Sequence, residues 1–461
     1  MTIMWSARDL SFALNQIVDF EANKPRFNSK SIEQNDFFIA LKGNTDGHNY
    51  IHDAFKRGAS CAIASYVPQD LPQGYKERLI IVEDTYRALL SLAKYRRQNC
   101  SAKFIAITGS SGKTSTKEAL AYVLAGFGTT FANEGNFNNH IGVPITLASM
   151  PYDAQYVILE VGMNHAGEIK PLAELIKAHI SIITNILPAH IGNFNSLEDI
   201  AREKSQIIQS SINKTCAIFH QNTSPEINSI ILKATKDAAI NTVLTFGQEG
   251  ANAVLMDYRL IEQDTALIKS SFGGMIYDLK TKLIGKHHAL NLLSVILVIY
   301  YLDLNLGRAI RFIEKFQPVS GRGQRISVKK FGKEFSVIDD TYNANPGSVE
   351  AALENLKHMM SKKKVAVLGD MLELGDREVV YHKDLLGALQ QSGIYKFIAI
   401  GPLMKNLYNE VQGIEKYYFH HTDELLDNLS AIIDDGDMVL FKASRSLQLS
   451  EAVKYLTNRD V

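Results

Sequence analysis

Short apolar segments that alternate with helix-length patterns constrain the fold of this 461-residue chain more than any other feature. An apolar run of about four to eight residues, bounded by turn signals, is typical of a strand buried on both faces. When such strands alternate with amphipathic helices, they form a parallel sheet covered by helices on both sides. The sequence therefore predicts an α/β protein. Strands are expected at 103–108, 156–161, 181–186, 217–220, 336–339, 365–369, 396–401 and 438–441.

Length and pattern divide the chain into three parts. At roughly 100–200 residues per domain, a chain of 461 residues is expected to contain about three domains. Apolar residues make up 46% of the chain, which is enough for sizeable cores. Residues 37–65 read as strand, turn, helix and strand, a unit too short for a complete doubly wound sheet, and 84–99 reads as a helix. We expect domains at 1–99, 100–317 and 318–461.

Charge, cysteine content and hydropathy exclude several classes of protein. The 49 Lys and Arg residues balance 49 Asp and Glu residues, so the chain lacks the excess of basic charge typical of proteins that bind nucleic acid or anionic membranes. Three cysteines without C-x-x-C spacing argue against a disulfide framework and favour a reducing compartment. The longest apolar stretch, 292–302, is about half of a membrane span, and Arg8 and Asp9 stand where a secretory signal has its apolar core. We expect a cytoplasmic protein without membrane insertion and without a nucleic-acid partner.

A glycine-rich turn between a buried strand and an amphipathic helix is the strongest functional signal. Residues 108–116 read TGSSGKTST. Gly109 and Gly112 permit positive φ and a close approach of backbone N–H groups to phosphate oxygens. Lys113 can then reach the β- and γ-phosphates, and the Thr114 hydroxyl can ligate Mg²⁺. The predicted phosphate-binding residues are Gly109, Ser110, Ser111, Gly112, Lys113, Thr114 and Ser115.

This turn predicts a nucleotide site but not a reaction. The strict G-x-x-x-x-G-K-[ST] pattern is not met, because its first glycine would fall on Ile107 inside the strand. An ordinary Gly/Ser turn that contains a lysine is the structural alternative. Since strand, turn, Lys-Thr pair and helix are all present, we favour the binding of ATP or GTP.

The shortened loop and nine further segments resemble the Mur ligase superfamily, the ATP-dependent amide-bond-forming enzymes of peptidoglycan precursor synthesis. These segments are NFNNHIGVP (136–144), LEVGMNHAGEI (159–169), TNILPAHIGNF (184–194), AREKSQI (201–207), GKHHALN (285–291), SGRGQR (320–325), DDTYNANPGS (339–348), LGDMLELG (368–375) and KASRS (442–446). The resemblance implies a small N-terminal α/β domain for a UDP-sugar, a central P-loop ATPase domain with a parallel sheet, and a C-terminal Rossmann-like domain that receives the amino component.

Three segments, GMNHAGEI, YNANP and GDMLELG, resemble the branch that joins D-alanyl-D-alanine to UDP-N-acetylmuramoyl-tripeptide. For this branch the resemblance implies ATP and Mg²⁺, transfer of the γ-phosphate to the substrate carboxylate, and attack of the dipeptide amine on the acyl phosphate. We expect a monomer whose partners are these small molecules. Two alternatives stay open: another amide ligase of the superfamily, such as one adding the third peptide residue or a folylpolyglutamate synthase, and a nucleotide-binding regulatory module.

The same resemblance assigns the metal and catalytic residues. Glu160, at the end of a predicted strand, resembles the family's Mg²⁺-binding glutamate, and His190 matches the histidine of a second metal position. Lys204 resembles a lysine that related ligases carry as a carbamate, an anionic oxygen ligand. The structural alternatives are a helix-capping carboxylate, an ordinary loop histidine and a solvated helix lysine. We predict Lys113, Glu160, His190 and Lys204 as catalytic, and Thr114, Glu160, His190 and Lys204 as metal ligands.

Four residues farther along the chain resemble contacts to ATP. His287 and Asn291 are one helical turn apart and lie near adenine by resemblance, although polar residues are also common at a helix N-terminus. Arg322, in a Gly-rich linker, is expected to move onto the phosphates when the C-terminal domain closes. Asp340, at the end of a strand, resembles the aspartate that contacts the ribose.

Substrate contacts are predicted from Asn-rich and basic segments. Amide side chains suit a UDP-sugar peptide, but Asn also favours turns, so both interpretations stay open. Lys442 and Arg445 are candidates for the dipeptide carboxylate or are plain surface charges. The predicted set is Ser29, Asn136, Asn138, Asn139, Asn343, Asn345, Lys442 and Arg445.

The chain departs from the usual residues of the family at a few positions. Asn28 and Lys30 stand where aspartate and arginine are usual, so that a bidentate guanidinium contact is replaced by a point charge. His288 stands in place of asparagine, and Ala443 in place of glycine. None of these positions belongs to the predicted phosphate or metal chemistry.

Overall fold

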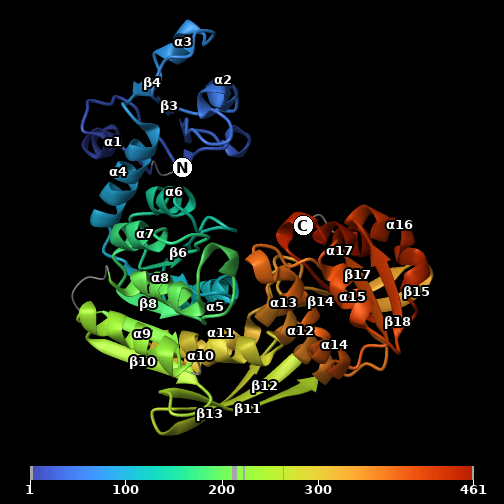
Figure 1. Cartoon of the computed structure of the whole chain (residues 1–461). Coiled ribbons are helices and arrows are strands. Elements are labelled where there is room, and N and C mark those ends of the chain that lie inside the picture. The colour runs from blue at the N-terminus through green and yellow to red at the C-terminus, as the bar shows by residue number, and fades with distance from the viewer. Residues whose placement is uncertain (1–3, 210–214, 222–223, 263, 459–461) are drawn as a thin grey trace.

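The computed structural model of the chain describes residues 4–209, 215–221, 224–262 and 264–458. Within these ranges the strands form three sheets, of four, nine and six strands. Each sheet belongs to one structural unit, and the units follow one another along the chain from blue to red in Figure 1. The predicted α/β class is confirmed.

The N-terminal sheet has the order β1-β2-β3-β4, with all neighbours parallel. Its strands are β1 (Pro25–Arg26), β2 (Phe37–Ile39), β3 (Cys61–Ala64) and β4 (Leu79–Ile81). Its helices are α1 (Ala7–Leu14), α2 (Ile51–Lys56), α3 (Gln73–Lys76) and α4 (Thr85–Gln98), with short 3-10 turns at Ser29–Ser31 and Gly47–Tyr50. Asp84 caps α4, because its carboxylate accepts hydrogen bonds from the N–H groups of Tyr86 and Arg87. The helix predicted over 84–99 is thus confirmed.

Apolar burial joins the N-terminal unit to the central unit. Trp5 is fully buried, and its indole Nε1 donates a 2.9 Å hydrogen bond to the carbonyl of Ala148 in α6 (Gly142–Ala148). Ile145 of α6 lies in the same core cluster as Leu89 of α4. Helix α6 therefore belongs to the cores of both units, and it lies between them in Figure 1.

The central sheet has the order β13-β12-β11-β10-β9-β8-β5-β7-β6. Its parallel strands are β5 (Lys103–Thr108), β6 (Thr130–Ala132), β7 (Tyr156–Glu160), β8 (Ile180–Ile183), β9 (Cys216–His220) and β10 (Thr242–Gly247). At one end, β11 (Ala253–Glu262), β12 (Thr265–Phe272) and β13 (Met275–Thr281) pair antiparallel. The prediction of a parallel central sheet is wrong at this end, where most residues of β11 and β13 are exposed or half-buried and the continuous apolar signal is lost.

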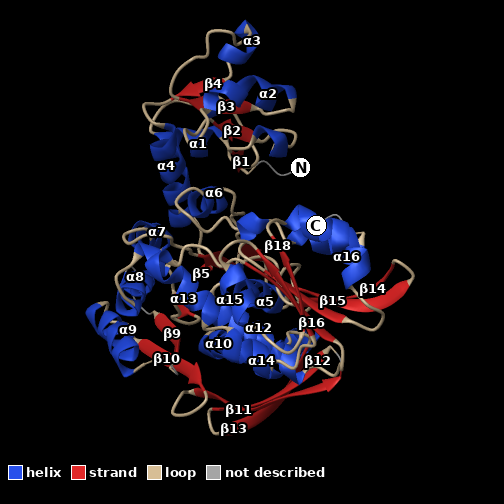
Figure 2. Ribbon diagram, turned by 45° about the vertical axis from the view of Figure 1, so that its right-hand side comes forward, coloured by secondary structure: helices blue, strands red, loops and turns tan. Residues whose placement is uncertain are grey.

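Helices cover both faces of the central sheet, as Figure 2 shows. They are α5 (Lys113–Ala125), α6, α7 (Ile169–Ile176), α8 (Leu197–Gln209), α9 (Pro225–Asp237), α10 (Lys286–Tyr301) and α11 (Leu306–Lys315). Ile105 and Ile107 of β5 pack into the cluster that contains α5 and α10, whereas Phe104 and Ala106 pack into the cluster of α6 to α9. Because both faces are buried, the strand is apolar at successive positions, and the sequence reveals it.

The C-terminal sheet has the order β14-β15-β19-β16-β17-β18. Its strands are β14 (Gln324–Lys330), β15 (Lys333–Asp339), β16 (Lys364–Gly369), β17 (Lys396–Ile400), β18 (Glu415–Phe419) and β19 (Met438–Lys442). Its helices are α12 (Pro346–His358), α13 (Glu378–Lys383), α14 (Leu386–Gln391), α15 (Met404–Glu410), α16 (Thr422–Ile432) and α17 (Ser450–Thr457). The sheet is parallel except for β14, and the sequence did not predict β14 or β18.

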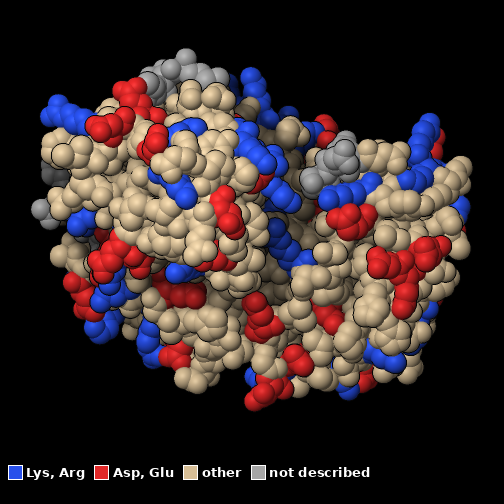
Figure 3. All heavy atoms as spheres, turned by 90° about the horizontal axis from the view of Figure 1, so that it is seen from above, with Lys and Arg blue, Asp and Glu red and all other residues tan. Residues whose placement is uncertain are grey.

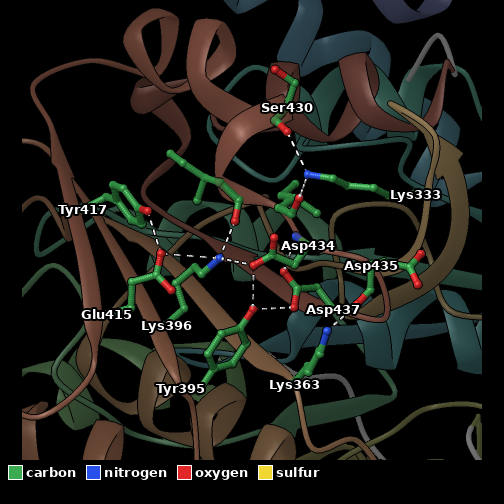
Figure 4. Close-up of polar contacts among 12 residues, drawn as sticks. Lys333, Lys363, Tyr395, Lys396, Glu415, Tyr417, Ser430, Asp434, Asp435 and Asp437 are labelled. Carbon is green, nitrogen blue, oxygen red and sulfur yellow. Dashed lines mark hydrogen bonds and ion pairs between the residues drawn. The ribbon is translucent and has the colours of Figure 1, made fainter.

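A polar cluster lies at the amino-terminal ends of the parallel strands of the C-terminal sheet (Figure 4). The buried Lys396 Nζ pairs with Asp434 Oδ2 at 2.8 Å and donates to the carbonyl of Ile432. Tyr395 donates a 2.7 Å hydrogen bond from its hydroxyl to Asp437 Oδ1. Since ligands of open α/β sheets bind at the carboxyl ends of the strands, this cluster at the opposite edge is part of the scaffold.

Candidate active site

A cavity of about 630 Å³ lies between the carboxyl ends of strands from the central and C-terminal sheets. It is lined by residues that follow β5, β7 and β8 on one side and β15, β16 and β19 on the other. In Figure 3 the surface is hollowed between two lobes, and Lys and Arg side chains line the hollow. The predicted site residues that line the cavity are Ser110, Ser111, Gly112, Lys113, Thr114, Ser115, Asn136, Asn138, Asn139, Glu160, His190, His287, Arg322, Asp340, Asn343, Asn345, Lys442 and Arg445.

The two glycines of the loop occupy positions that exclude a side chain. Gly109 has φ +150°, and a Cβ there would lie 1.9 Å from Thr184 Oγ1. Gly112 has φ +78°, and a Cβ there would lie 2.2 Å from Asn291 Nδ2. Asn291 therefore supports the loop from behind the cavity wall.

The segment after β8 fixes the loop between these glycines. Ser110 Oγ donates a 2.8 Å hydrogen bond to the carbonyl of Leu187, and the Ser111 N–H donates to Asn185 Oδ1 at 2.8 Å. Thr184 Oγ1 donates to the carbonyl of Ser111 at 2.6 Å. The loop is therefore held in one conformation before any ligand binds, which lowers the entropic cost of binding a phosphate.

Lys113 and Arg322 bring positive charge to the loop from two units. Lys113 Nζ donates a 2.8 Å hydrogen bond to the carbonyl of Gly109, and burial holds the pKa of its ammonium below the usual value, an effect that Glu160 opposes. Arg322 Nη2 donates a 2.7 Å hydrogen bond to Thr114 Oγ1. Arg322 thus contacts the loop in this structure, and its guanidinium carbon lies 3.6 Å from the ring centre of Tyr342.

Hard oxygen ligands meet at the end of β7. Glu160 is 2% exposed; its Oε2 accepts a 2.8 Å hydrogen bond from Thr114 Oγ1, and its Oε1 accepts one of 2.7 Å from Asn138 Nδ2. A carboxylate and a hydroxyl beside a phosphate loop are the donor set that Mg²⁺ uses with substrate phosphates and water. The residues present therefore fit this ion. Among the described residues, no group of three or more His, Cys, Asp and Glu side chains is arranged to hold a metal.

Asn133 holds Glu160 in place, and sequence reasoning missed this residue. It is 1% exposed; its Oδ1 accepts a hydrogen bond from the Glu160 N–H at 2.9 Å, and its Nδ2 donates to the Glu160 carbonyl at 3.1 Å. The same Nδ2 also donates to the carbonyl of Phe137, in the Asn-rich loop. One side chain thus connects the backbone of Glu160, a predicted metal ligand, to the predicted substrate loop.

Lys204 lies behind the cavity wall on α8. Its side chain is buried, and its Nζ makes no hydrogen bond or ion pair with any described residue. Burial, and then the charge of Lys113, hold its pKa well below the usual value, whereas Glu203 opposes the shift. The solvated-helix alternative is therefore wrong, and the amine is held in a setting that favours its neutral, nucleophilic form.

His190 lies at the contact between the central and C-terminal units. Its Nδ1 pairs with Glu373 Oε2, from the GDMLELG segment after β16. Beside this pair, the backbones of Gly192 and Gly375 are in direct contact. A Cβ on Gly192 would lie only 2.6 Å from the Gly375 nitrogen. His190, a predicted metal ligand, is thus paired in this structure with a carboxylate that lies 183 positions farther along the chain.

Lys442, a candidate for the dipeptide carboxylate or a surface charge, is 3% exposed and already has an acidic partner. Its Nζ pairs with Asp340 Oδ2 at 2.7 Å and donates to the carbonyl of Asn343 at 3.1 Å. The pair forms because β15 and β19 are neighbours, so that the residues at their carboxyl ends meet. Arg445 lines the cavity, with its guanidinium 5.5 Å from the ring centre of Tyr342.

Three predicted substrate asparagines accept hydrogen bonds from nearby backbone N–H groups, and one of them caps a helix. Asn139 Oδ1 accepts hydrogen bonds from the N–H groups of Ile141 and Gly142, and Asn345 caps α12 in a reciprocal box with Ser348. The Asn343 side chain accepts from the Ala344 N–H. These three side chains therefore make the local contacts typical of turns, and all of them also line the cavity, so their predicted substrate role stays a prediction.

Ser29 is not brought to the cavity. It is buried in the N-terminal unit, where Asn28 Oδ1 accepts a hydrogen bond from the Lys30 N–H. A second hollow of about 980 Å³ lies between α4 and α7 and shares Asn139, Gly162, Asn164 and Glu168 with the cavity. It extends the cavity toward the N-terminal unit.

Comparison with known proteins agrees with this architecture. Residues 107–299 match the model of the Mur ligase middle domain, and residues 321–445 match that of the Mur ligase, glutamate ligase domain. The chain belongs to the Mur ligase family. It is similar to proteins named UDP-N-acetylmuramoyl-tripeptide--D-alanyl-D-alanine ligase: 36% identical to that of Rickettsia prowazekii over 98% of this chain and 100% of the relative, and 31% identical to that of Bacillus subtilis over 93% and 92%.

Solved structures give the same result. The crystal structure of MurF from Acinetobacter baumannii is 29% identical, covers 99% of each chain and has a TM-score of 0.85. MurF ligase from Thermotoga maritima in complex with ADP is 26% identical, covers 94% of this chain and 97% of its own, and has a TM-score of 0.80.

Proposed function

We propose that this protein joins D-alanyl-D-alanine to UDP-N-acetylmuramoyl-tripeptide with the hydrolysis of ATP, giving the pentapeptide precursor of peptidoglycan, ADP and phosphate. The observation that carries the proposal is the placement of a phosphate loop against Thr114 and Glu160 in a chain that matches ligases of that name over nearly its whole length. The domains would be 1–99 for the UDP-sugar, 100–317 for ATP and 318–461 for the dipeptide.

The first step transfers the γ-phosphate of ATP to the tripeptide carboxylate. Two anions must approach, so positive charge has to be present where they meet. Lys113, in the loop, and Arg322, which contacts the loop from the linker to the C-terminal unit, supply it. Thr114 and Glu160 would hold Mg²⁺, which supplies further positive charge to the phosphates when bound.

In the second step the dipeptide amine attacks the acyl phosphate. A C–N bond forms, the C–O bond to phosphate breaks, and the nitrogen loses a proton. Since Lys442 is paired with Asp340, we assign the dipeptide carboxylate to Arg445, which lines the cavity from the C-terminal unit. The guanidinium suits a carboxylate because it can donate two parallel hydrogen bonds.

The UDP-sugar peptide would reach this site along the hollow between α4 and α7. The continuity of that hollow with the cavity supports such a path from the N-terminal unit. His287 and Asp340 would contact the adenosine part of ATP.

Lys204 would act as a carbamate. Its buried, unpaired amine supports this role, since a neutral amine forms an N–C bond to CO₂, releases one proton and becomes an anionic oxygen ligand near Lys113.

The test is to incubate the protein with ATP, UDP-MurNAc-tripeptide and one amine at a time, and to measure phosphate release and ligated product. D-Ala-D-Ala is expected to support turnover. A dipeptide precursor with lysine or diaminopimelate, or folate with glutamate, would support it if the chain were another amide ligase. Binding of ATP with no product from any amine would indicate a nucleotide-controlled regulatory module.

We further propose that the protein works as a monomer in the cytoplasm. The three cysteines are free and buried, which suits a reducing compartment. None of the helices in the described ranges is long and apolar enough to cross a membrane. Light scattering of the purified chain at several concentrations tests the monomer.

A further inference from the structure

His288, in the first turn of α10, lines the cavity with a ring nitrogen that lacks a partner. The residue is 7% exposed, and its Nδ1 has no hydrogen-bond partner among the described residues. A buried polar atom left in this state costs free energy, and such atoms in folded proteins usually have a partner or mark a functional site. The side chain is therefore placed to form a hydrogen bond with a ligand that enters the cavity.

The surroundings of His288 keep its ring neutral. Burial is the main reason that the pKa of His288 lies well below its usual value. The pKa is lowered further by His287 on α10, Arg322 in the linker and Lys442 on β19. A neutral imidazole has one nitrogen that donates and one that accepts. Arg322 and Lys442 already have partners in Thr114 and Asp340, and neither is hydrogen-bonded to this ring.

The position of His288 connects the phosphate loop to the C-terminal unit. His288 lies three residues before Asn291, and residues three apart lie on the same face of a helix. Asn291 in turn contacts Gly112 of the phosphate loop. On the other side of the cavity lies Asp340, whose carboxylate is paired with Lys442. A nucleotide whose phosphates lie on the loop would therefore bring its nucleoside part near this ring.

We propose that His288 forms a hydrogen bond with a ribose hydroxyl of ATP and makes this chain select ribonucleotides over deoxyribonucleotides. A hydroxyl both donates and accepts, so that it matches either tautomer of the ring, whereas a phosphate oxygen only accepts. The proposal rests on the proposed use of ATP. It also gives a function to the histidine that stands where the family usually has asparagine.

The experiment compares ATP, 2′-deoxy-ATP and 3′-deoxy-ATP in the wild type, His288→Leu and His288→Asn. The wild type is expected to lose about 5- to 10-fold in kcat/KM with one of the two deoxy nucleotides, as one hydrogen bond implies. His288→Leu is expected to lose about the same factor with ATP, chiefly through KM, and nothing further with that deoxy nucleotide. His288→Asn, which keeps a donor and an acceptor, is expected to retain part of the discrimination.

His220→Leu is the matched control, since His220 is a half-buried histidine whose buried Nε2 also has no partner among the described residues, but it does not line the cavity. It is expected to keep the discrimination of the wild type. A His288→Leu protein whose KM rises equally for all three nucleotides would overturn the proposal and point to a phosphate contact or to packing. Calorimetric binding of ADP and its deoxy analogues gives the same comparison without turnover, so the inference can be judged even if no ligase product forms.

Discussion

Thr114 Oγ1 donates a 2.8 Å hydrogen bond to Glu160 Oε2, across 46 positions of sequence. The contact places a hydroxyl from the phosphate loop beside the carboxylate at the end of the neighbouring strand β7, where one cation can bind both. Glu160→Gln keeps the shape of the side chain and removes its charge. We expect turnover to fall at least about 100-fold and the Mg²⁺ concentration for half activity to rise. Phosphate release measured against Mg²⁺ checks this, and Glu134→Gln, an exposed neighbour, is the control. An unchanged Mg²⁺ requirement would contradict the assignment.

Gly112→Ala tests the fit of the phosphate loop. The added methyl would meet Asn291 Nδ2, so we expect nucleotide binding to be lost. Gly274 has the same φ, +78°, with nothing in the described structure within 4 Å of its Cβ position. Gly274→Ala therefore shares the backbone strain, about 1–2 kcal/mol, without the contact. ADP binding by calorimetry compares the two, and equal losses would show that strain alone is responsible.

Lys204→Ala is expected to lower turnover by at least about 10-fold, because an anionic ligand near the metal would be missing. A short carboxylate such as propionate should restore part of the activity by occupying the vacated space. Lys233→Ala on the exposed face of α9 serves as the control. A carbon-13 signal from labelled bicarbonate, present in the wild type and absent from Lys204→Ala, would identify the carbamate. Full activity of Lys204→Ala without additives would exclude it.

Asn133→Ala tests the support of Glu160. Two hydrogen bonds to the Glu160 backbone disappear, and we expect the affinity for Mg²⁺ to fall about 10- to 100-fold. Asn305→Ala removes the cap of α11 and costs about 1 kcal/mol of stability, with no expected change in Mg²⁺ dependence. If both variants shift the thermal midpoint and neither changes the Mg²⁺ dependence, the role of Asn133 is confined to stability.

His179 predicts a loss of stability in acid. Burial, with the charges of Arg97 and Lys103, lowers its pKa from 6.5 to about 4, and its Nδ1 accepts a 2.9 Å hydrogen bond from the Phe104 N–H. Because the folded pKa lies below the unfolded one, the contribution is complete above pH 6.5 and is lost as the pH falls toward 4. It amounts to about 1–3 kcal/mol after solvent screening.

The check is the thermal midpoint between pH 7 and 4. His179→Asn keeps an acceptor for the Phe104 N–H but cannot be protonated, so its midpoint should depend less on pH than that of the wild type. The exposed His421→Asn should follow the wild type. Parallel curves for all three proteins would rule out His179 as the titrating group.

The sequence predicted the strands that are buried on both faces, because they are apolar at every position. In β16, for example, Ala366 and Leu368 pack on one face while Val365 and Val367 pack on the other. Strands β11 to β14 were missed because one face of each carries exposed polar residues and the apolar run is interrupted. Local pattern therefore reports burial more directly than it reports strand structure.

The phosphate loop could be predicted from the sequence because its residues are contiguous and the role of each follows from its residue type and its place in the turn. The partners of the site residues could not, because tertiary structure brings them together. Lys442 meets Asp340 across 102 positions, and His190 meets Glu373 across 183. Asn133 has the composition of an ordinary turn residue, and only its burial and its hydrogen bonds to Glu160 show its role.

The backbone contact between Gly192 and Gly375 leaves no room for even one methyl group. A side chain at either position would push the two backbones apart. Its size would set the distance between the C-terminal unit and the loop that carries His190. The separation of the two halves of the cavity is thus adjustable in graded steps by point substitution, at positions that contribute no chemical group to the reaction.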